Sequence, residues 1–310
     1  GAVSVWFVHH PREWIREQRA SLPALLTAPL FWMGNPLGDL TDALSWTGHD
    51  AVYEYDEPPP ANEVFFAGAP KRVGAPAPTD VQIMPRGEFT VGYSRKLGHA
   101  VWVGYHVPAE AAHEAGKRPS FRRDPEVPNC PSADAYARSG YDRGHLAPNH
   151  AIATRFGPDE QRKTFLMTNV APQSPSLNRG PWRFVERAIA DVWTRRYGEI
   201  WVVAGTIPSS SGERVSGTEV DVPDACWQVI AAQTADGVRA MAFVMPQTIR
   251  FGAFPVHHLV TVDELERLTG LDFFPELPGF LQEPLEADLP TRLWPVDFFD
   301  VFRLMALRFT

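Results

Sequence analysis

The chain lacks the features that define several classes of protein. It has two cysteines in 310 residues and no CxxC motif, so it is not built on a disulfide framework. No run of 18 apolar residues occurs, which argues against a membrane-spanning helix. Positive charge is in deficit, since 29 Lys and Arg face 37 Asp and Glu, for a net charge of −8. Taken alone, this balance speaks against a nucleic-acid binder, because such proteins usually carry net positive charge.

The remaining composition is that of a globular protein rich in proline. Hydrophobic residues make up 44% and charged residues 21%, which argues against wholesale disorder. The 30 prolines predict many loops, above all between residues 36 and 85. We therefore divide the chain into a Pro-rich extension (1–80), a main domain (81–277) and an acidic, aromatic tail (278–310) that packs on the core. Cys130 and Cys226 could form one bridge, but we favour two buried, unpaired thiols.

Apolar periodicity predicts strands interspersed with helices. Strands are expected where β-branched and aromatic residues cluster, at 88–95, 99–107, 199–205, 226–232 and 238–245. Helices are expected at 14–26, 178–197 and 261–269, the last with Thr261 as N-cap and Glu264 as its capping-box partner. Residues 116–138 are polar and broken by proline, which predicts a loop. Because the order shows no regular βαβ rhythm and no internal repeat, the fold class predicted is α+β.

The chemically informative stretch runs from residue 139 to 186 and contains the tetrapeptide DRGH at 142–145. A phosphodiester hydrolase needs a base for water, a cation for the leaving oxygen and positive groups for the charge that develops at phosphorus. His145 is a candidate base because the unperturbed pKa of histidine is near neutrality. On an extended segment alternate side chains share a face, so Arg143 could grip a phosphate beside His145.

Asn178 and Glu186 are candidates for holding a divalent cation. In an ideal helix they would differ by about 80° around the axis and about 12 Å along it, so one small ion is not expected to touch both. Because Mg²⁺ keeps several waters, we expect Asn178 as the inner ligand and Glu186 at the water shell of the ion. Asn178 would also lie near a helix N-terminus, which favours phosphate.

Three motifs in this stretch resemble the DNA/RNA non-specific endonuclease family (ββα-metal nucleases, endonuclease G-like). They are SGYDRGHLAPNH, TFLMTNVAPQ and LNRGPWRFVE, in the order and spacing of the family. Weaker similarity covers about residues 85–277. The resemblance implies a ββα-metal nuclease fold over residues 81–277, with a central antiparallel sheet flanked by helices.

The resemblance also implies an activity and a set of roles. The activity is that of a Mg²⁺-dependent, sugar non-specific endonuclease that hydrolyses DNA and RNA and leaves 5′-phosphates, with Mn²⁺ as a substitute ion. The implied roles are His145 as general base, Asn178 as metal ligand, Glu186 as holder of a metal-bound water, Arg143 as phosphate-stabilising cation and Asn169 as support for this region. The family's basic-loop arginine matches Arg118 best, with Arg122 and Arg123 as open alternatives.

Partners and location follow from the same resemblance. DNA and RNA are the expected substrates, homodimers are common in the family, and no membrane insertion is expected. If the activity serves as a toxin or defence effector, a protein inhibitor is a further expected partner. We expect a secreted, periplasmic or organellar location rather than a free cytoplasmic one, although the chain shows no secretory signal. The rival hypothesis is a nucleic-acid-binding scaffold on an inactive nuclease core.

Each candidate residue also has a structural interpretation. Asn178 could cap a helix, and Asn169 could be a turn residue. Glu186 could be a solvated helix position beside Arg183 or Arg187. The remaining alternatives are an ion pair of Arg143 with Asp142 and an ordinary surface charge at Arg118.

Charge is unevenly distributed along the chain. Residues 117–187 contain 12 basic and 7 acidic residues, a local balance of +5. Residues 263–300 contain 2 basic and 10 acidic residues, a balance of −8 that equals the net charge of the whole chain. The candidate site therefore lies in a locally positive segment, as attraction of phosphate requires. The acidic net charge does not exclude a nuclease.

Overall fold

The computed structural model describes residues 64–235, 237–297, 300 and 304. The helix expected at 14–26, most of the Pro-rich extension and the end of the tail lie outside the described residues.

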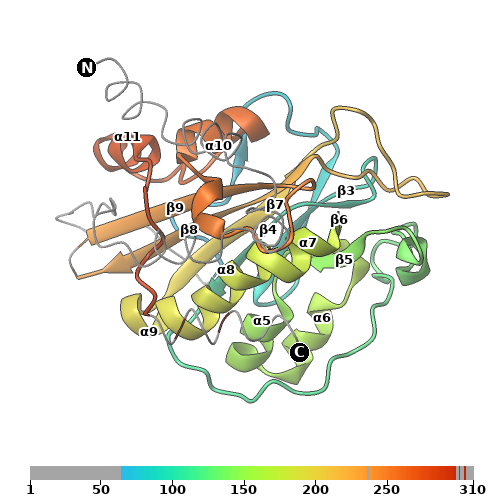
Figure 1. Ribbon diagram of the computed structural model, residues 1–310, viewed down its shortest axis with the longest axis horizontal. Helices are drawn as coiled ribbons and strands as arrows, with labels where there is room; N and C mark the ends of the chain where they lie inside the picture. The colour runs from blue at the N-terminus through green and yellow to red at the C-terminus, as the bar shows by residue number, and fades with distance from the viewer. Residues whose placement is uncertain (1–63, 236, 298–299, 301–303, 305–310) are drawn as a thin grey trace, which may run out of the picture.

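A seven-stranded antiparallel sheet organises the described part of the chain (Figure 1). The strand order across the sheet is β10-β9-β8-β7-β4-β3-β2. The bounds are β2 (Val81–Pro85), β3 (Phe89–Ser94), β4 (His99–Val107), β7 (Ile200–Ile207), β8 (Ala225–Thr234), β9 (Gly237–Pro246) and β10 (Leu259–Val260). Two smaller pairs are β1 (Lys71–Arg72) with β11 (Leu271–Asp272) and β5 (Asp142–His145) with β6 (Val170–Gln173). The five predicted strands are confirmed.

Both faces of the central sheet are buried because its strands alternate apolar side chains to either side. In β8, Cys226 and Ile230 belong to one hydrophobic cluster, while Trp227 and Val229 belong to a second. This follows from the two-residue period of a strand. Full burial of a large apolar side chain stabilises the fold by about 1.5–3 kcal/mol, so both clusters contribute strongly.

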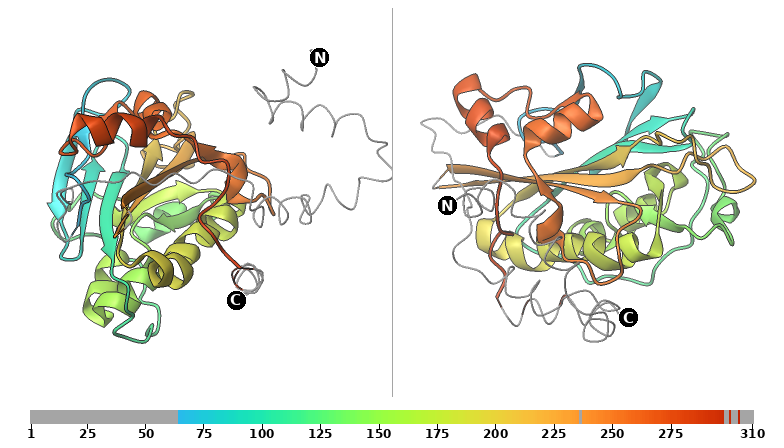
Figure 2. Two further views of the ribbon diagram at one scale, coloured as in Figure 1. Left: turned by 90° about the vertical axis from the view of Figure 1, so that its left-hand side faces the viewer. Right: turned by 45° about the horizontal axis from the view of Figure 1, so that its top comes forward.

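Helices cover the two faces in separate groups (Figure 2). Those from the middle of the chain are α5 (Asn149–Phe156), α6 (Pro158–Thr164), α7 (Pro175–Leu177), α8 (Arg183–Ala188) and α9 (Thr194–Tyr197). Those on the opposite face are α10 (Val262–Thr269) and α11 (Gly279–Ala287). Short 3-10 turns are η1 (Ala133–Tyr136), η2 (Met167–Asn169) and η5 (Pro255–His258). The predicted α+β class, with a central antiparallel sheet flanked by helices, is confirmed.

The helix expected over residues 178–197 begins earlier and is irregular. It starts at Pro175 and passes through two π-type turns, η3 (Asn178–Trp182) and η4 (Ile189–Trp193). Gly180 is not helical (φ −105°, ψ −117°), because Pro181 removes a backbone donor and disfavours helix in the residue before it. The ideal-helix relation between Asn178 and Glu186 is therefore wrong. The predicted apolar face is confirmed, since Trp182, Val185, Ile189, Val192 and Trp193 are all buried.

The signals predicted for α10 are confirmed except for one contact. Thr261 Oγ1 accepts a hydrogen bond from the backbone N–H of Glu264 at 2.9 Å, and Gly270 ends the helix in the left-handed region (φ 67°). The carboxylate of Glu264 pairs with Arg267, one turn along, at 2.6 Å. In a full capping box the carboxylate of Glu264 would instead accept a hydrogen bond from the backbone N–H of Thr261.

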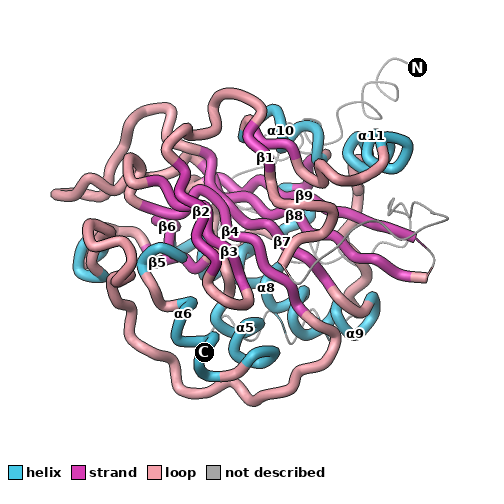
Figure 3. Tube along the Cα trace, turned by 180° about the vertical axis from the view of Figure 1, so that it is seen from behind, coloured by secondary structure: helices cyan, strands magenta, loops and turns pink. Residues whose placement is uncertain are grey.

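The described parts of the extension and the tail pack on the same sheet. Phe65 and Phe66 lie in the second cluster, and β1 pairs with β11 near α10 (Figure 3). Trp294 lies in the first cluster, where its carbonyl accepts a hydrogen bond from Trp193 Nε1 at 3.1 Å. The folded part of the chain thus includes residues on both sides of the 81–277 segment.

Cys130 and Cys226 are buried and unpaired, which confirms the favoured prediction. Within the described ranges, the structure contains no helix with the length and apolar character needed to cross a membrane.

Candidate active site

The DRGH tetrapeptide forms β5, one strand of a two-stranded antiparallel sheet beside the central sheet (Figure 1). Asp142–His145 pairs antiparallel with Val170–Gln173. Asn169 ends η2 directly before β6, and Asn178 follows β6 by five residues. The three motifs, separate in the sequence, therefore meet around this two-stranded sheet.

The strand β5 requires glycine at position 144, the third residue of DRGH. A Cβ atom added to Gly144 would lie 2.2 Å from Oε1 of Gln173, closer than real Cβ atoms come to any neighbour. Gln173 is fully buried, so its side chain cannot swing out into solvent to make room. The glycine of DRGH thus allows β5 to lie close against the Gln173 side chain beside His145.

Replacing Gly144 by alanine is expected to destabilise the fold by about 1–3 kcal/mol, as overpacking of a buried site does. Cleavage of nucleic acid should fall by about 100-fold, because a displacement of β5 moves its neighbour His145. Thermal melting and a plasmid-cleavage assay measure the two effects. Gly279→Ala is the matched control, since a Cβ there meets no atom within 4 Å. Wild-type melting and cleavage in Gly144→Ala would contradict the packing argument.

His145 lies between two phenylalanine rings. Its ring centroid is 5.0 Å from that of Phe121 and 4.8 Å from that of Phe165, the latter edge-on. Nε2 is shielded from solvent and has no hydrogen-bond partner among the described residues, whereas Nδ1 is not shielded in this way. Burial, and secondarily the charge of Arg118, lowers the pKa of His145 to about 3. The imidazole is therefore neutral at physiological pH, the form that can accept a proton.

Arg143 lies beside His145 across a shared aromatic ring. Its guanidinium is 5.1 Å from the centroid of the Phe121 ring that also contacts His145. One of its nitrogens donates to the carbonyl of Ala133 at 3.1 Å, and the side chain is otherwise exposed. The alternative ion pair with Asp142 is not formed, because that carboxylate binds other residues. Arg143 is left available for an anion next to His145.

Asp142 orients the side chain of Asn178. Its carboxylate accepts a hydrogen bond from Asn178 Nδ2 at 2.9 Å and two from Arg179, at 2.8 and 2.7 Å. An ionised carboxylate only accepts hydrogen bonds, so it selects the amide nitrogen of Asn178. The amide oxygen of Asn178 must then point elsewhere and is free to act as a ligand.

Glu186 is not a solvated helix position. Its Oε1 accepts a hydrogen bond from Trp182 Nε1 at 3.0 Å. Burial raises the pKa of Glu186 to about 8, although that bond and the charges of Arg183, Arg187 and Arg118 act in the opposite direction. A buried carboxyl whose charge lacks a full counter-charge is a group that a cation would stabilise.

Asn169 is the last residue of the short turn η2, and its side chain is also a buried clamp. Its Oδ1 accepts from the backbone N–H of Ala147 at 2.9 Å, and its Nδ2 donates to the carbonyls of Ala147 and Thr164 at 3.0 and 2.9 Å. These bonds join Ala147, two residues after His145, and the end of α6 to the end of η2. The buried side chain of Asn169 thus supports the segment that follows His145.

The loop over residues 116–138, which we call the basic loop, contains the three candidate arginines Arg118, Arg122 and Arg123. Of these, Arg118 is the one whose charge affects the site. Its guanidinium is 5.7 Å from the centroid of the Phe165 ring, and it lowers the pKa of His145. Arg122 joins its backbone to the residues around Phe165, with its side chain exposed. Arg123 donates to a carbonyl within its own loop.

The donor groups at this site fit a hard divalent cation. The amide oxygen of Asn178 and the carboxylate of Glu186 are oxygen ligands, as Mg²⁺, Mn²⁺ and Ca²⁺ prefer. A second acidic group, Asp263, Glu266 and Glu286, lies between α10 and α11 on the opposite face of the sheet. That group lacks the neighbouring arginines and histidine that phosphodiester chemistry needs.

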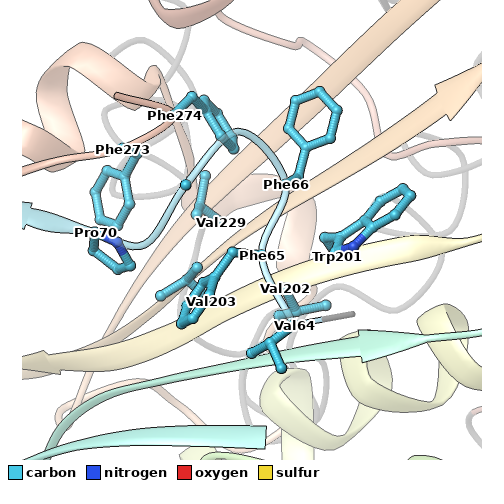
Figure 4. A pocket seen from close by; sticks show the side chains of 11 residues that line it. Val64, Phe65, Phe66, Pro70, Trp201, Val202, Val203, Val229, Phe273 and Phe274 are labelled. Atoms are coloured by element: carbon cyan, nitrogen blue, oxygen red, sulfur yellow. The ribbon is translucent and has the colours of Figure 1, made fainter. Parts of the chain in front are cut away.

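An apolar cavity on the same opposite face is too small for a substrate (Figure 4). Its volume is about 10 Å³, the space of one water molecule. The lining comes from Phe66, Trp201 and Phe274 with their aliphatic neighbours. The cavity offers no polar group for phosphate.

Two aromatic residues of the site were missed at the level of sequence. Phe121 and Phe165 enclose His145, and each also contacts one of the arginines. A weak signal existed, since Phe165 lies inside the second motif and Phe121 closes the basic segment that begins at Lys117. Aromatic residues in such positions are more often core residues, so the signal was not specific.

Comparison with known proteins agrees with this geometry. A family model described as DNA/RNA non-specific endonuclease matches residues 67–280. A nuclease of Nostoc sp. is 31% identical over 223 residues, which cover 67% of this chain and 78% of that protein. Mitochondrial endonuclease G of Bos taurus is 30% identical over 240 residues, 68% of this chain and 79% of that protein. The mitochondrial nuclease EXOG of Xenopus laevis is 28% identical over 277 residues, 83% of this chain and 76% of that protein.

A solved structure resembles the fold as well. The crystal structure of the EndoG/EndoGI complex, described as showing the mechanism of EndoG inhibition, superposes with a TM-score of 0.58 at 25% identity. The match covers 64% of this chain and 88% of that chain.

Proposed function

Because this chain belongs to the DNA/RNA non-specific endonuclease family, and is thus a nuclease of a metal-dependent family, we propose that it is a Mg²⁺-dependent enzyme that cleaves both DNA and RNA with His145 as general base. The products would be oligonucleotides with 5′-phosphates. The observation that carries the proposal is the position of His145 between two aromatic rings, with exposed Arg143 and Arg118 around it.

The ring nitrogen of His145 that would accept the proton is Nδ1. Since Nε2 is the shielded nitrogen, Nδ1 is the one that water can reach. In the neutral tautomer with the proton on Nε2, Nδ1 accepts a proton from the water that attacks phosphorus. The low pKa keeps this lone pair free at neutral pH. General-base catalysis of this kind contributes roughly 10²- to 10⁴-fold to a rate.

The arginines and the oxygen ligands deal with the charge of the phosphodiester. Arg143 and Arg118 would bind non-bridging phosphate oxygens from the side of His145, where each is held over a phenylalanine ring. The oxygen of Asn178 would bind Mg²⁺ directly, and Glu186 would accept hydrogen bonds from the ion's water shell. When bound, the ion neutralises the charge that builds up on the phosphate and the leaving 3′-oxygen.

Removal of divalent metal is expected to abolish cleavage of supercoiled plasmid, and added Mg²⁺ to restore it, because the side chains alone lack a cation for the leaving oxygen. The test is a plasmid-nicking assay with EDTA, with an RNA substrate in parallel. A 5′-phosphate product would accept a kinase label only after phosphatase treatment. Binding of nucleic acid without cleavage under any divalent metal would favour the rival, an inactive scaffold. Cleavage that persists in excess EDTA would contradict the metal requirement.

The biological setting is a further part of the proposal. We propose that the nuclease acts as a toxin or defence effector, or in an organelle, and that a protein inhibitor holds it in check. Two facts support this: the structurally similar EndoG is described in complex with the inhibitor EndoGI, and similar nucleases are mitochondrial proteins. A homodimer is also proposed. Copurification of an inhibitory protein with the native chain would support the effector role.

A further inference from the structure

Asp124 is a buried carboxylate at which three distant segments meet. It is 1% exposed. Its Oδ2 accepts hydrogen bonds from Arg86, at 2.7 and 3.2 Å, and from Thr168 Oγ1 at 2.7 Å. Its Oδ1 accepts from the backbone N–H of Glu126 at 2.9 Å. The three segments are the β2–β3 turn, the basic loop and η2, the turn that leads into β6.

The charge of Asp124 is retained despite its burial. Burial by itself raises the pKa of this carboxyl, but the hydrogen bonds of Thr168 and Glu126 and the guanidinium of Arg86 outweigh it, and the net pKa is lowered. A fully satisfied buried ion pair is rigid, because loss of any partner leaves a buried charge uncompensated. Asp124 therefore fixes the separation between the basic loop and η2.

The basic loop and the residues between α6 and η2 provide the two rings that contact His145. Arg122 donates its backbone N–H to the carbonyl of Phe165 at 3.0 Å, and its own carbonyl accepts from Met167 at 2.9 Å. Phe121, next to Arg122, and Phe165 are the two rings that contact His145. They also contact each other, at 5.0 Å between centroids.

The loop before this bridge has few other attachments. Within the described residues, no hydrogen bond holds segment 117–121, which carries Arg118 and Phe121. Its position therefore depends on the packing of Phe121 against the first cluster and Phe165, and on the hydrogen-bonded anchors that follow it, the backbone of Arg122 and, two residues later, Asp124. A shift in the Asp124 network would move the Phe121 ring relative to His145.

We propose that the buried network of Arg86, Asp124 and Thr168 is a positioning element for catalysis, which holds Phe121 and Phe165 in place around His145. None of the three residues contacts the candidate substrate site, so they act through the two rings. This inference rests on the proposed function of His145 as the base. The network shapes the environment of that base, and a loosened pocket admits water to the imidazole.

Thr168→Val tests the proposal with the smallest change of shape. It removes one hydrogen bond from Asp124 and keeps the ion pair with Arg86. We expect kcat to fall about tenfold with KM little changed, because the reacting group is misplaced more than the substrate. We also expect the acid limb of the kcat–pH profile to move upward, since entry of water lets the pKa of His145 rise toward its usual 6.5. The charged groups near His145 that must stay in place for this comparison are Arg118 and Arg143.

Thr269→Val is the matched control. Thr269 is another buried threonine, on the opposite face of the sheet, whose Oγ1 donates to the carbonyl of Leu265 at 2.8 Å and, more weakly, to that of Glu266 at 3.5 Å, and accepts from the backbone N–H of Leu271 at 3.3 Å. Its substitution should lower the melting temperature and leave kcat and the acid limb unchanged. If Thr168→Val behaves in the same way as this control, the network is merely structural and the proposal is overturned.

A readout without catalysis separates this inference from the proposed function. NMR titration of the labelled His145 ring in the metal-free, full-length chain should show a higher pKa in Thr168→Val than in the wild type. If the wild type cleaves nothing, the proposed function fails, but this titration still decides whether the network controls the pocket. Asp124→Asn should give a larger shift of the same sign where it folds, and Thr168→Val decides the matter where it does not. An unshifted titration in the folded Thr168→Val variant overturns the proposal.

Discussion

His145→Ala is expected to lower kcat for plasmid cleavage by roughly 10²- to 10⁴-fold, the range for loss of a general base. The physical reason is that Nδ1 of His145 is the neutral, water-accessible nitrogen beside Arg143 and Arg118. Binding of nucleic acid should change little, because the arginines remain. Steady-state cleavage and a filter-binding measurement with EDTA present separate the two quantities.

Stability measurements provide an internal check on the same variant. The pKa of His145 is lowered to about 3, so between about pH 6.5 and 3 the unfolded chain binds a proton that the folded chain does not. Wild-type stability therefore falls as pH drops through this window, and His145→Ala should show a flatter dependence. His113→Ala, at an exposed histidine, is the control and should match the wild type in cleavage. Near-wild-type cleavage by His145→Ala would overturn the assignment of the base.

Asn178→Ala is expected to reduce cleavage at saturating Mg²⁺ by about 100- to 1,000-fold, the cost of losing one group that stabilises developing charge. The amide oxygen is the group at stake, because Asp142 binds the nitrogen of the same amide. The apparent affinity for Mg²⁺ should fall with it. Cleavage rates measured across a Mg²⁺ titration, repeated with Mn²⁺, give both effects.

Asp142→Asn is the informative companion to Asn178→Ala. A neutral amide at position 142 can donate as well as accept, so it no longer selects which end of the Asn178 amide faces the ion. The expected result is a weaker apparent Mg²⁺ affinity, by about 10- to 100-fold, with much of the maximal rate recovered at high Mg²⁺. Asn129→Ala, at an exposed asparagine of the basic loop, controls for loss of an amide. An unchanged Mg²⁺ dependence in Asn178→Ala would exclude it as the ligand.

Helices and strands whose formation depends on residues close together in the chain could be predicted from the sequence. The strand β8 follows from alternation, and the start of α10 follows from Thr261, whose hydroxyl caps a backbone group three residues away. The irregular start of the α7–α9 run was signalled by Gly180 and Pro181 but was not predicted. Its apolar periodicity is strong, and periodicity does not report a local break.

The members of the site were predictable for a different reason. His145, Asn169, Asn178 and Glu186 lie in three short motifs whose order and spacing resemble a known family, and the family membership is confirmed, while their roles stay predictions. Their partners were not predictable, because these come from elsewhere in the chain. Phe121 contacts His145 from the basic loop, which precedes β5 in the chain. Asp124 binds Thr168, which lies 44 residues away in the sequence.

The sequence by itself determined which chemical groups are available and the class of fold, because motifs and alternation are local properties of the chain. It also determined that the candidate site lies in a locally positive segment of an acidic chain. Only the tertiary structure decided which group faces which: the Asn178 amide toward Asp142, the imidazole between two rings, and Arg118 rather than Arg122 or Arg123 near His145. The pKa of a side chain and the direction of an amide depend on burial and on partners that arrive only when distant segments pack together.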